Sequence, residues 1–155
     1  MDFSHVLIAT DGSDGAGKAA AVAGELARAL SARVSVLFVQ NDDLVLSNAW
    51  GAGGFPGGPA QGAMSVEQIR NMLEHQAHET ELPKTVKALG PLDEEVQSVM
   101  VWGRPAEEIC RFAREQNVDL IVIGSHGRSG FREALLGSVS HAVANQASCP
   151  VMIVR

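Results

Sequence analysis

Short, continuously apolar runs alternate along this chain with stretches of helical periodicity. The apolar runs are of the length typical of strands that are buried on both faces, and they lie at residues 5–10, 33–39, 96–102, 120–124 and 151–154. After the first run, Ala19, Val22, Ala23 and Leu26 recur at three- and four-residue spacing, which indicates an amphipathic helix. The alternation predicts an α/β fold, a doubly wound five-stranded parallel sheet with helices on both faces.

Helices are expected at residues 15–30, 65–90 and 105–116, and from Gly137 onward. Ser65 precedes Glu67 and Gln68, a composition typical of a helix start. Pro83 should kink or split that helix, because proline lacks a backbone N–H and its ring crowds the preceding turn.

The 155 residues suffice for one domain, residues 1–155, with a substantial core. The net charge of -6 argues against a nucleic-acid partner held by phosphate contacts. No apolar run approaches the roughly 20 residues of a membrane span. The N-terminus has no basic residue before its apolar run, which argues against a signal peptide and favours a cytoplasmic protein. Cys110 and Cys149 lie in apolar contexts and are interpreted as small buried side chains.

A glycine-rich segment interrupts the pattern between the second strand and the next helix. Residues 48–64 hold six of the sixteen glycines and two of the six prolines. Such a composition predicts a long flexible loop, at about 41–64. Two interpretations stay open: a lid that contacts a ligand through Trp50 or Phe55, or a disordered insertion.

The strongest functional signal is the stretch from residue 121 to residue 140. In doubly wound sheets, ligands bind beyond the carboxyl ends of the strands. Gly124, Gly127 and Gly130 follow the fourth strand at three-residue intervals, and glycines allow backbone to approach a ligand closely. Successive N–H groups in such a turn can bind an anion, and Arg128 adds positive charge.

A second anion-binding element follows in Gly137-Ser138-Val139-Ser140. If a helix begins there, its free N–H groups and its dipole favour a phosphate, with two hydroxyls as further donors. Two such elements around one loop suit a polyphosphate. The alternative is a glycine-rich turn that merely connects a strand to a helix.

These residues carry a resemblance to a known family. Gly124, Gly127, Gly137 and Ser138 have the spacing G-x2-G-x9-G-[ST], and "VLIATDGS", "GRPAEEI" and "CPVMIVR" occur in the corresponding places along the chain. In these features the sequence resembles the universal stress protein family, specifically its ATP-binding branch. The resemblance spans almost the whole chain. It implies the adenine nucleotide alpha hydrolase-like fold, with strand order 3-2-1-4-5.

The resemblance also implies an ATP site with Mg²⁺ or Mn²⁺ on the phosphates. In that site Asp11 would hydrogen-bond the ribose or adenine, and Val39 and Ile123 would pack on the adenine. The binding residues so implied, together with Arg128, are Ala9, Thr10, Asp11, Val39, Ile123, Gly124, His126, Gly127, Arg128, Gly137, Ser138, Val139 and Ser140. The family resemblance further implies a homodimer that pairs through the last strand, 151–154.

Two classes of function remain open for such a site. The leading hypothesis is a regulatory, stress-response ATP-binding module, and the alternative is a slow ATPase or phosphoryl-transfer enzyme that uses the same residues. The sequence places no carboxylate beside the glycine loop to act as a base, so no catalytic residue is assigned. His126 would serve as a donor to ribose or phosphate, or as a general base if hydrolysis occurs.

Two weaker motifs favour simpler interpretations. Gly12, Gly17 and Lys18 fit the start of a P-loop, but Ala19 stands where that motif needs a hydroxyl, so Lys18 is interpreted as a solvated helix residue. His75 and His78 are three residues apart on a predicted helix without a third ligand, and they are interpreted as surface residues and not as a metal site.

Overall fold

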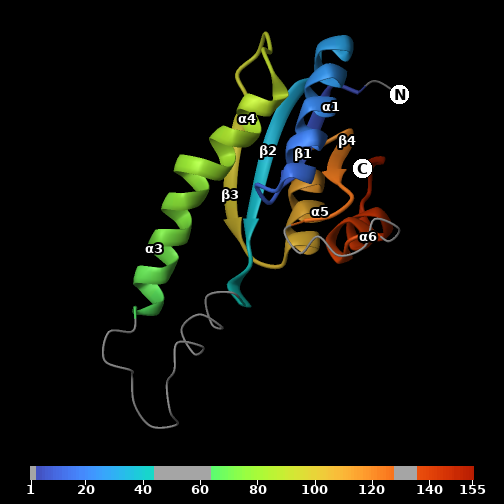
Figure 1. Ribbon diagram of the computed structural model, residues 1–155. Coiled ribbons are helices and arrows are strands. Elements are labelled where there is room, and N and C mark those ends of the chain that lie inside the picture. The colour runs from blue at the N-terminus through green and yellow to red at the C-terminus, as the bar shows by residue number, and fades with distance from the viewer. Residues whose placement is uncertain (1–2, 44–63, 128–135) are drawn as a thin grey trace.

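The computed structural model describes residues 3–43, 64–127 and 136–155. Their elements alternate as the sequence predicts (Figure 1): β1 (His5–Thr10), α1 (Asp14–Leu30), β2 (Arg33–Gln40), α3 (Val66–Gln76), η1 (Ala77–Glu81), α4 (Leu82–Leu89), β3 (Gln97–Trp102), α5 (Pro105–Glu115), β4 (Leu120–Gly124), α6 (Ser138–Gln146) and β5 (Val151–Val154). All strand pairs are parallel, in the order β3-β2-β1-β4-β5. The predicted doubly wound α/β fold and strand order are confirmed. The strand order reverses between β1 and β4, which are neighbours.

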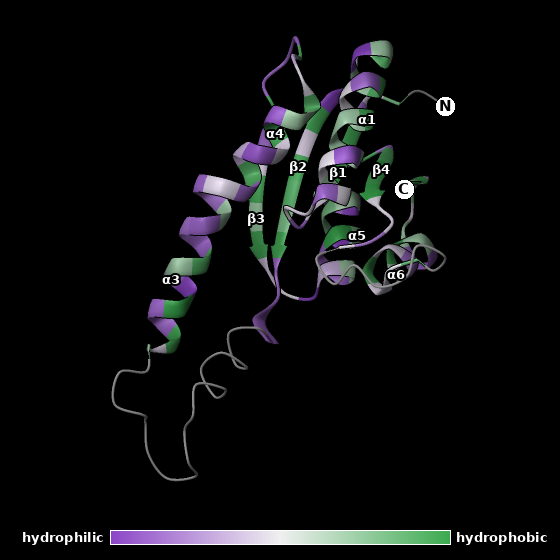
Figure 2. Cartoon of the chain, viewed as in Figure 1, coloured by the Kyte–Doolittle hydropathy of each residue, from purple (hydrophilic) through white to green (hydrophobic). Residues whose placement is uncertain are grey.

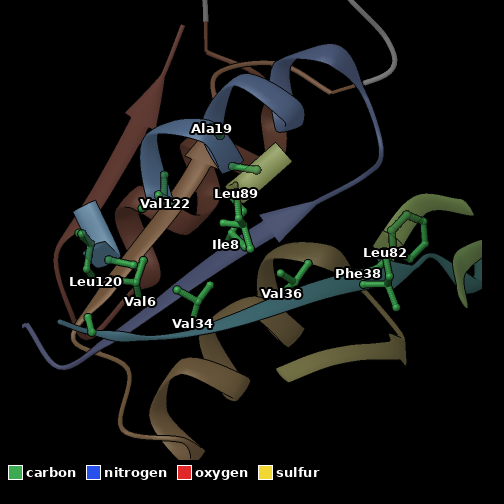
Figure 3. Close-up of a cluster of buried hydrophobic side chains, with 14 of the residues drawn as sticks. Val6, Ile8, Ala19, Val34, Val36, Phe38, Leu82, Leu89, Leu120 and Val122 are labelled. Atoms are coloured by element: carbon green, nitrogen blue, oxygen red, sulfur yellow. The ribbon is translucent and has the colours of Figure 1, made fainter. Parts of the chain in front are cut away.

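Alternate residues of the central strands point to opposite faces of the sheet, and each face has its own core. On one face, Val6, Ile8 and Val122 pack with Ala19 of α1 and Leu89 of α4, as Figure 3 shows. The opposite face carries a second cluster, to which β1, β2, β4, α5 and α6 contribute: Leu7, Ala9, Leu37, Ile109, Cys110, Ala113, Ile121, Ile123 and Val143. Because both faces are covered, β1 and β4 are buried over their whole length, and the interior of β1, Val6 to Ala9, is apolar (Figure 2).

The helix start at Ser65 is confirmed by a capping box. The Ser65 hydroxyl accepts from Gln68 N at 3.1 Å, and the Gln68 side chain accepts from Ser65 N at 2.8 Å. The same helix changes its period at η1, a π-helical turn that ends two residues before Pro83. The predicted effect of Pro83 therefore takes this form: a widened turn precedes the proline, whose missing N–H and bulky ring disturb regular α-helical bonding.

Of the residues of α3, only Ile69 is buried, and much of this helix is hydrophilic (Figure 2). Polar contacts attach it to the carboxyl end of β3. The Arg70 guanidinium lies over the Trp102 ring, 4.6 Å from its centroid, and the Trp102 indole N–H donates to Glu74 at 2.7 Å. Arg70 also pairs with Asp42 at 2.5 Å. The glycine-rich segment predicted as a lid or an insertion lies outside the described residues, apart from its last residue.

The cysteine prediction holds for Cys110, which is buried on α5, whereas Cys149 is only partly buried. Burial raises the pKa of both thiols above the usual value for cysteine. Within the described parts of the chain, no helix combines the length and apolarity needed to cross a membrane.

Candidate functional site

A cavity opens at the carboxyl edge of the sheet, where β1 and β4 separate. It spans about 690 Å³ of empty space, part of which is open to solvent. The residues around it are Ala9, Thr10, Asp11, Ala16, Leu37, Val39, Pro105, Ile109, Ile123, Gly124, His126, Gly127, Gly137, Ser138, Val139 and Ser140. Every predicted binding residue is among them except Arg128, which lies outside the described residues. That they bind a ligand stays a prediction.

One wall of the cavity is apolar. It combines Leu37 and Val39 of β2, Pro105 and Ile109 of α5, and Ile123 of β4. Sequence reasoning missed Leu37, Pro105 and Ile109, and also Ala16 at the start of α1. Spacing could have suggested two of them. Leu37 shares a sheet face with Val39 because it is two residues away, and Ile109 lies one helical turn after Pro105.

The N-terminus of α6 also lines the cavity. Gly137 is its N-cap and makes no side-chain capping bond, whereas the Ser13 hydroxyl caps α1 by accepting from Ala16 N at 3.2 Å. The first N–H groups of a helix have no partner within the helix, so those of Ser138, Val139 and Ser140 are available at the cavity. The dipole of α6 adds partial positive charge there.

The Ser140 hydroxyl is used inside the protein. It lies 3.0 Å from the carbonyl oxygens of both Ser125 and Gly137, to which it can donate. Gly137 N–H donates to the same Ser125 oxygen at 2.7 Å. These bonds fix the start of α6 against the end of β4. What Ser140 offers a ligand is therefore its backbone N–H, and the hydroxyl available from this turn belongs to Ser138.

His126 lines the cavity, and one of its ring nitrogens is buried. Its Nε2 is buried and, within the part of the chain that the structure describes, has no hydrogen-bond partner. Its Nδ1 lies 3.1 Å from the Ser125 hydroxyl oxygen. Buried polar atoms are nearly always hydrogen-bonded in native proteins, so this nitrogen calls for a partner that the described residues do not supply.

Asp11 and Gly127 both line the cavity and lie directly against each other. A Cβ atom on Gly127 would lie 2.4 Å from Asp11 Oδ2, so a larger residue at this position would displace the carboxylate. The other oxygen, Oδ1, accepts from Ser13 N at 3.0 Å. The sequence interpretation that no carboxylate lies beside the glycine loop is therefore wrong. Asp11 is more than one hundred residues from Gly127 in the chain, but the parallel sheet brings their strand ends together.

The residues of the weaker motifs lie elsewhere. Lys18 is exposed on α1 and does not line the cavity, as expected of a solvated helix residue and not of a P-loop lysine. His75 and His78 are exposed. The described residues include no group of three or more His, Cys, Asp or Glu side chains that could hold a metal ion.

Comparison with known proteins adds to this geometry. The chain matches the Universal stress protein family over residues 2–155. It is similar to universal stress protein YxiE of Bacillus subtilis, with 35% identity over 153 residues that cover 99% of each chain. Its fold is similar to that of MJ0577 of Methanocaldococcus jannaschii, with a TM-score of 0.80, 25% identity and coverage of 99% and 96% of the two chains. A universal stress protein of Archaeoglobus fulgidus in complex with dAMP is similar over 100% of both chains, with a TM-score of 0.61 and 25% identity.

Proposed function

The chain belongs to the universal stress protein family, and on that premise we propose that it binds ATP in the cavity at the carboxyl edge of its sheet. In this proposal the protein is a regulatory module whose nucleotide state alters its shape or its choice of partner. The solved relative that holds dAMP supports an adenine nucleotide as the ligand class.

The observation that carries the proposal is the polarity of the cavity. The side formed by Leu37, Val39 and Ile109 is apolar and suits a nucleobase. The first turn of α6 also lines the cavity, and its N–H groups, which have no partner within the helix, and its dipole suit phosphate. His126 and Asp11 line the same cavity, and His126 Nε2 has no hydrogen-bond partner among the described residues. An adenine nucleotide has this division of character, with an apolar base at one end and an anionic chain at the other.

A divalent cation would enter this site with the nucleotide. Mg²⁺ and Mn²⁺ prefer oxygen ligands, and among the described residues that line the cavity only Asp11 carries a carboxylate. One carboxylate and the Ser138 hydroxyl are too few ligands to hold such an ion alone. The phosphate oxygens would supply most of the ligands of the ion. The ion would neutralise the part of the phosphate charge that the α6 N–H groups do not balance.

Slow hydrolysis of ATP at the same site is the second candidate, and the position of Asp11 favours it. A carboxylate near the glycine loop could accept a proton from an attacking water. Turnover with Mg²⁺ that is well above background, and that Asp11→Asn abolishes while ATP still binds, would identify an enzyme. Binding without turnover would identify a sensor.

We also propose that the protein is a homodimer that pairs through β5. This strand lies at one edge of the sheet and pairs with β4 on one side only. Met152 on it is 36% exposed. An edge strand with unpaired backbone groups and an exposed apolar side chain favours pairing with a second copy.

Calorimetry with ATP and Mg²⁺ tests the proposed function. The wild type is compared with Gly127→Val, whose Cβ would displace the Asp11 carboxylate, and with Gly17→Ala, where a Cβ meets no atom within 4 Å. We expect a dissociation constant on the order of micromolar for the wild type and for Gly17→Ala, and binding at least about tenfold weaker for Gly127→Val. Circular dichroism checks that each variant is folded.

Either of two results would overturn the proposal. A wild type that binds no adenine nucleotide leaves the cavity without this function. Equal binding by a folded Gly127→Val protein means that the nucleotide lies elsewhere. Titrations with ADP and AMP then measure how much the phosphates contribute, and affinity should rise with each added phosphate if the α6 N-terminus holds them.

A further inference from the structure

The turn between β1 and α1 is held by a helix from a distant part of the chain. This turn carries Asp11 and Gly12, and α4 lies against it. Gly12 has a φ of +76°, and a Cβ there would lie 1.7 Å from Glu81 Oε2, so the Glu81 carboxylate rests directly on the turn. Glu81 is only 7% exposed. The proposed ligand contact of Asp11 therefore depends on a turn whose outer side is covered by η1 and α4.

A chain of hydrogen bonds with a defined direction joins this turn to α4. Gly12 N–H donates to Thr10 Oγ1 at 3.1 Å, the Thr10 and Thr85 hydroxyl oxygens are 2.8 Å apart, and Thr85 Oγ1 lies 2.9 Å from the Glu81 carbonyl oxygen. A hydroxyl has one hydrogen. If Thr85 donates to the Glu81 carbonyl, Thr10 must donate to Thr85, and Thr10 is left to accept from Gly12. This assignment satisfies every group in the chain.

Both hydroxyls are shielded from water, with Thr10 7% and Thr85 2% exposed. Water cannot readily replace a lost partner at such sites, so the cost of breaking the chain is the cost of an unsatisfied buried donor. The carbonyl of Gly12 is held as well, because Lys84 Nζ donates to it at 2.8 Å. Two consecutive residues of α4 thus restrain Gly12, the residue that follows Asp11. Thr85 restrains its N–H through Thr10, and Lys84 binds its C=O.

We propose that Thr85 is a positioning residue of the nucleotide site, which acts through Thr10 and Gly12 to hold Asp11 in the orientation that binds the ligand. The inference rests on the proposed function, in which Asp11 accepts a hydrogen bond from the ribose or the adenine. Thr85 does not line the cavity and touches no ligand. Its effect on affinity therefore passes entirely through the β1–α1 turn.

The test compares Thr85→Val, which keeps the shape and removes the hydroxyl, with Thr85→Ser, which restores it. Thr80→Val is the matched control, because Thr80 is exposed on η1 of the same continuous helical segment. Calorimetry with ATP and Mg²⁺ should show binding about 5- to 30-fold weaker for Thr85→Val, and within about twofold of wild type for Thr85→Ser and Thr80→Val. In an Asp11→Asn background, Thr85→Val should weaken binding no further, because the two changes remove the same contact.

A second readout needs no nucleotide. Hydrogen exchange of the Gly12 and Ser13 amides in the ligand-free protein should be faster in Thr85→Val and unchanged in Thr80→Val. If Thr85→Val does not fold, Lys84→Met removes the partner of the Gly12 carbonyl instead, at a side chain that is 53% exposed. Lys84→Met should also speed hydrogen exchange of the Gly12 and Ser13 amides. It should weaken ATP binding when residue 11 is aspartate, and not in the Asp11→Asn background.

The outcomes separate the two proposals. If the wild type binds ATP and Thr85→Val binds it equally well, the positioning role is overturned while the proposed function stands. Weakening that persists in full in the Asp11→Asn background also overturns it, since Thr85 would then act by another route. If the wild type binds no adenine nucleotide, both the proposed function and this inference are wrong. Unchanged exchange at Gly12 overturns the hydrogen-bonded connection whether or not a nucleotide binds.

Discussion

Helices α1 and α4 approach so closely at Gly24 that a single methyl group should destabilise the fold. A Cβ at Gly24 would lie 1.9 Å from the carbonyl oxygen of Leu89 and 2.7 Å from its carbonyl carbon. Backbone atoms cannot swing aside as a long side chain does. In Gly24→Ala, α4 must therefore move away from α1 as a body, which would loosen the packing of Leu89 on Ala19 and Ile8.

Two effects of opposite sign decide the magnitude. Alanine favours the helix over glycine by about 1 kcal/mol. Overpacking a tight contact costs about 1–3 kcal/mol, and a clash with backbone belongs at the upper end of that range. The net expectation is a loss of about 2 kcal/mol, which for a domain of this size lowers Tm by roughly 4–8 °C.

Gly17→Ala in the same helix supplies the matched control. A Cβ there meets no atom within 4 Å, so only the helical preference acts. This variant should gain up to about 1 kcal/mol and raise Tm by about 2–4 °C. Urea titration and thermal melts followed by circular dichroism measure both variants. A Gly24→Ala protein that is as stable as the wild type, or more stable, would refute the close approach of α1 and α4.

Two further predictions concern acid stability and assembly. Burial, aided by the Arg33 guanidinium, lowers the pKa of His5 below its usual value, so the unfolded chain binds this proton more tightly than the folded one. The free energy of unfolding, measured by urea titration, should therefore fall as the pH drops below about 6.5. His5→Gln should make this pH dependence weaker. A stability that rises on acidification in this range would contradict the assignment. Met152→Lys places a charge on the exposed side of β5 and should convert a dimer of twice 16.3 kDa to the monomer in light scattering, whereas a wild type that is monomeric at every concentration would exclude pairing through β5.

The order of elements could be predicted from the sequence because each strand is short, apolar and flanked by breakers. His5–Thr10 and Leu120–Gly124 are continuous buried runs, and such runs have few alternatives to a central parallel strand. The form of the break near Pro83 could not be read in the same way. Proline marks where regular α-helix is disturbed, but whether the turn bends, splits or widens depends on how η1 packs against its neighbours.

The site was predictable in part for the same reason. Strand ends and glycine spacing are local features, and they pointed to the loop that begins at Asp11 and to the 124–140 stretch. The family resemblance supplied Val39 and the ligand role of Asp11. Leu37 and Ile109 were missed, because an apolar residue that lines a cavity has the same sequence pattern as one in the core, and only their spacing from Val39 and Pro105 sets them apart. No feature of the sequence pointed to Thr85. Its contact with Thr10 joins residues 75 positions apart and arises only when α4 packs beside α1.

Some glycines of the glycine pattern lie where two backbone segments approach closely, and this explains them without a ligand. A Cβ at Gly124 would lie 3.0 Å from the backbone of Gly15 in α1, so a side chain there would press β4 against α1 even when no nucleotide is present. Gly127 differs, because among the described residues its Cβ would meet the side chain of Asp11 and no backbone. A change at Gly124 would alter stability and binding together, whereas a change at Gly127 bears on the site alone. Gly127 is therefore the position at which lost binding reports on the ligand and not on the fold.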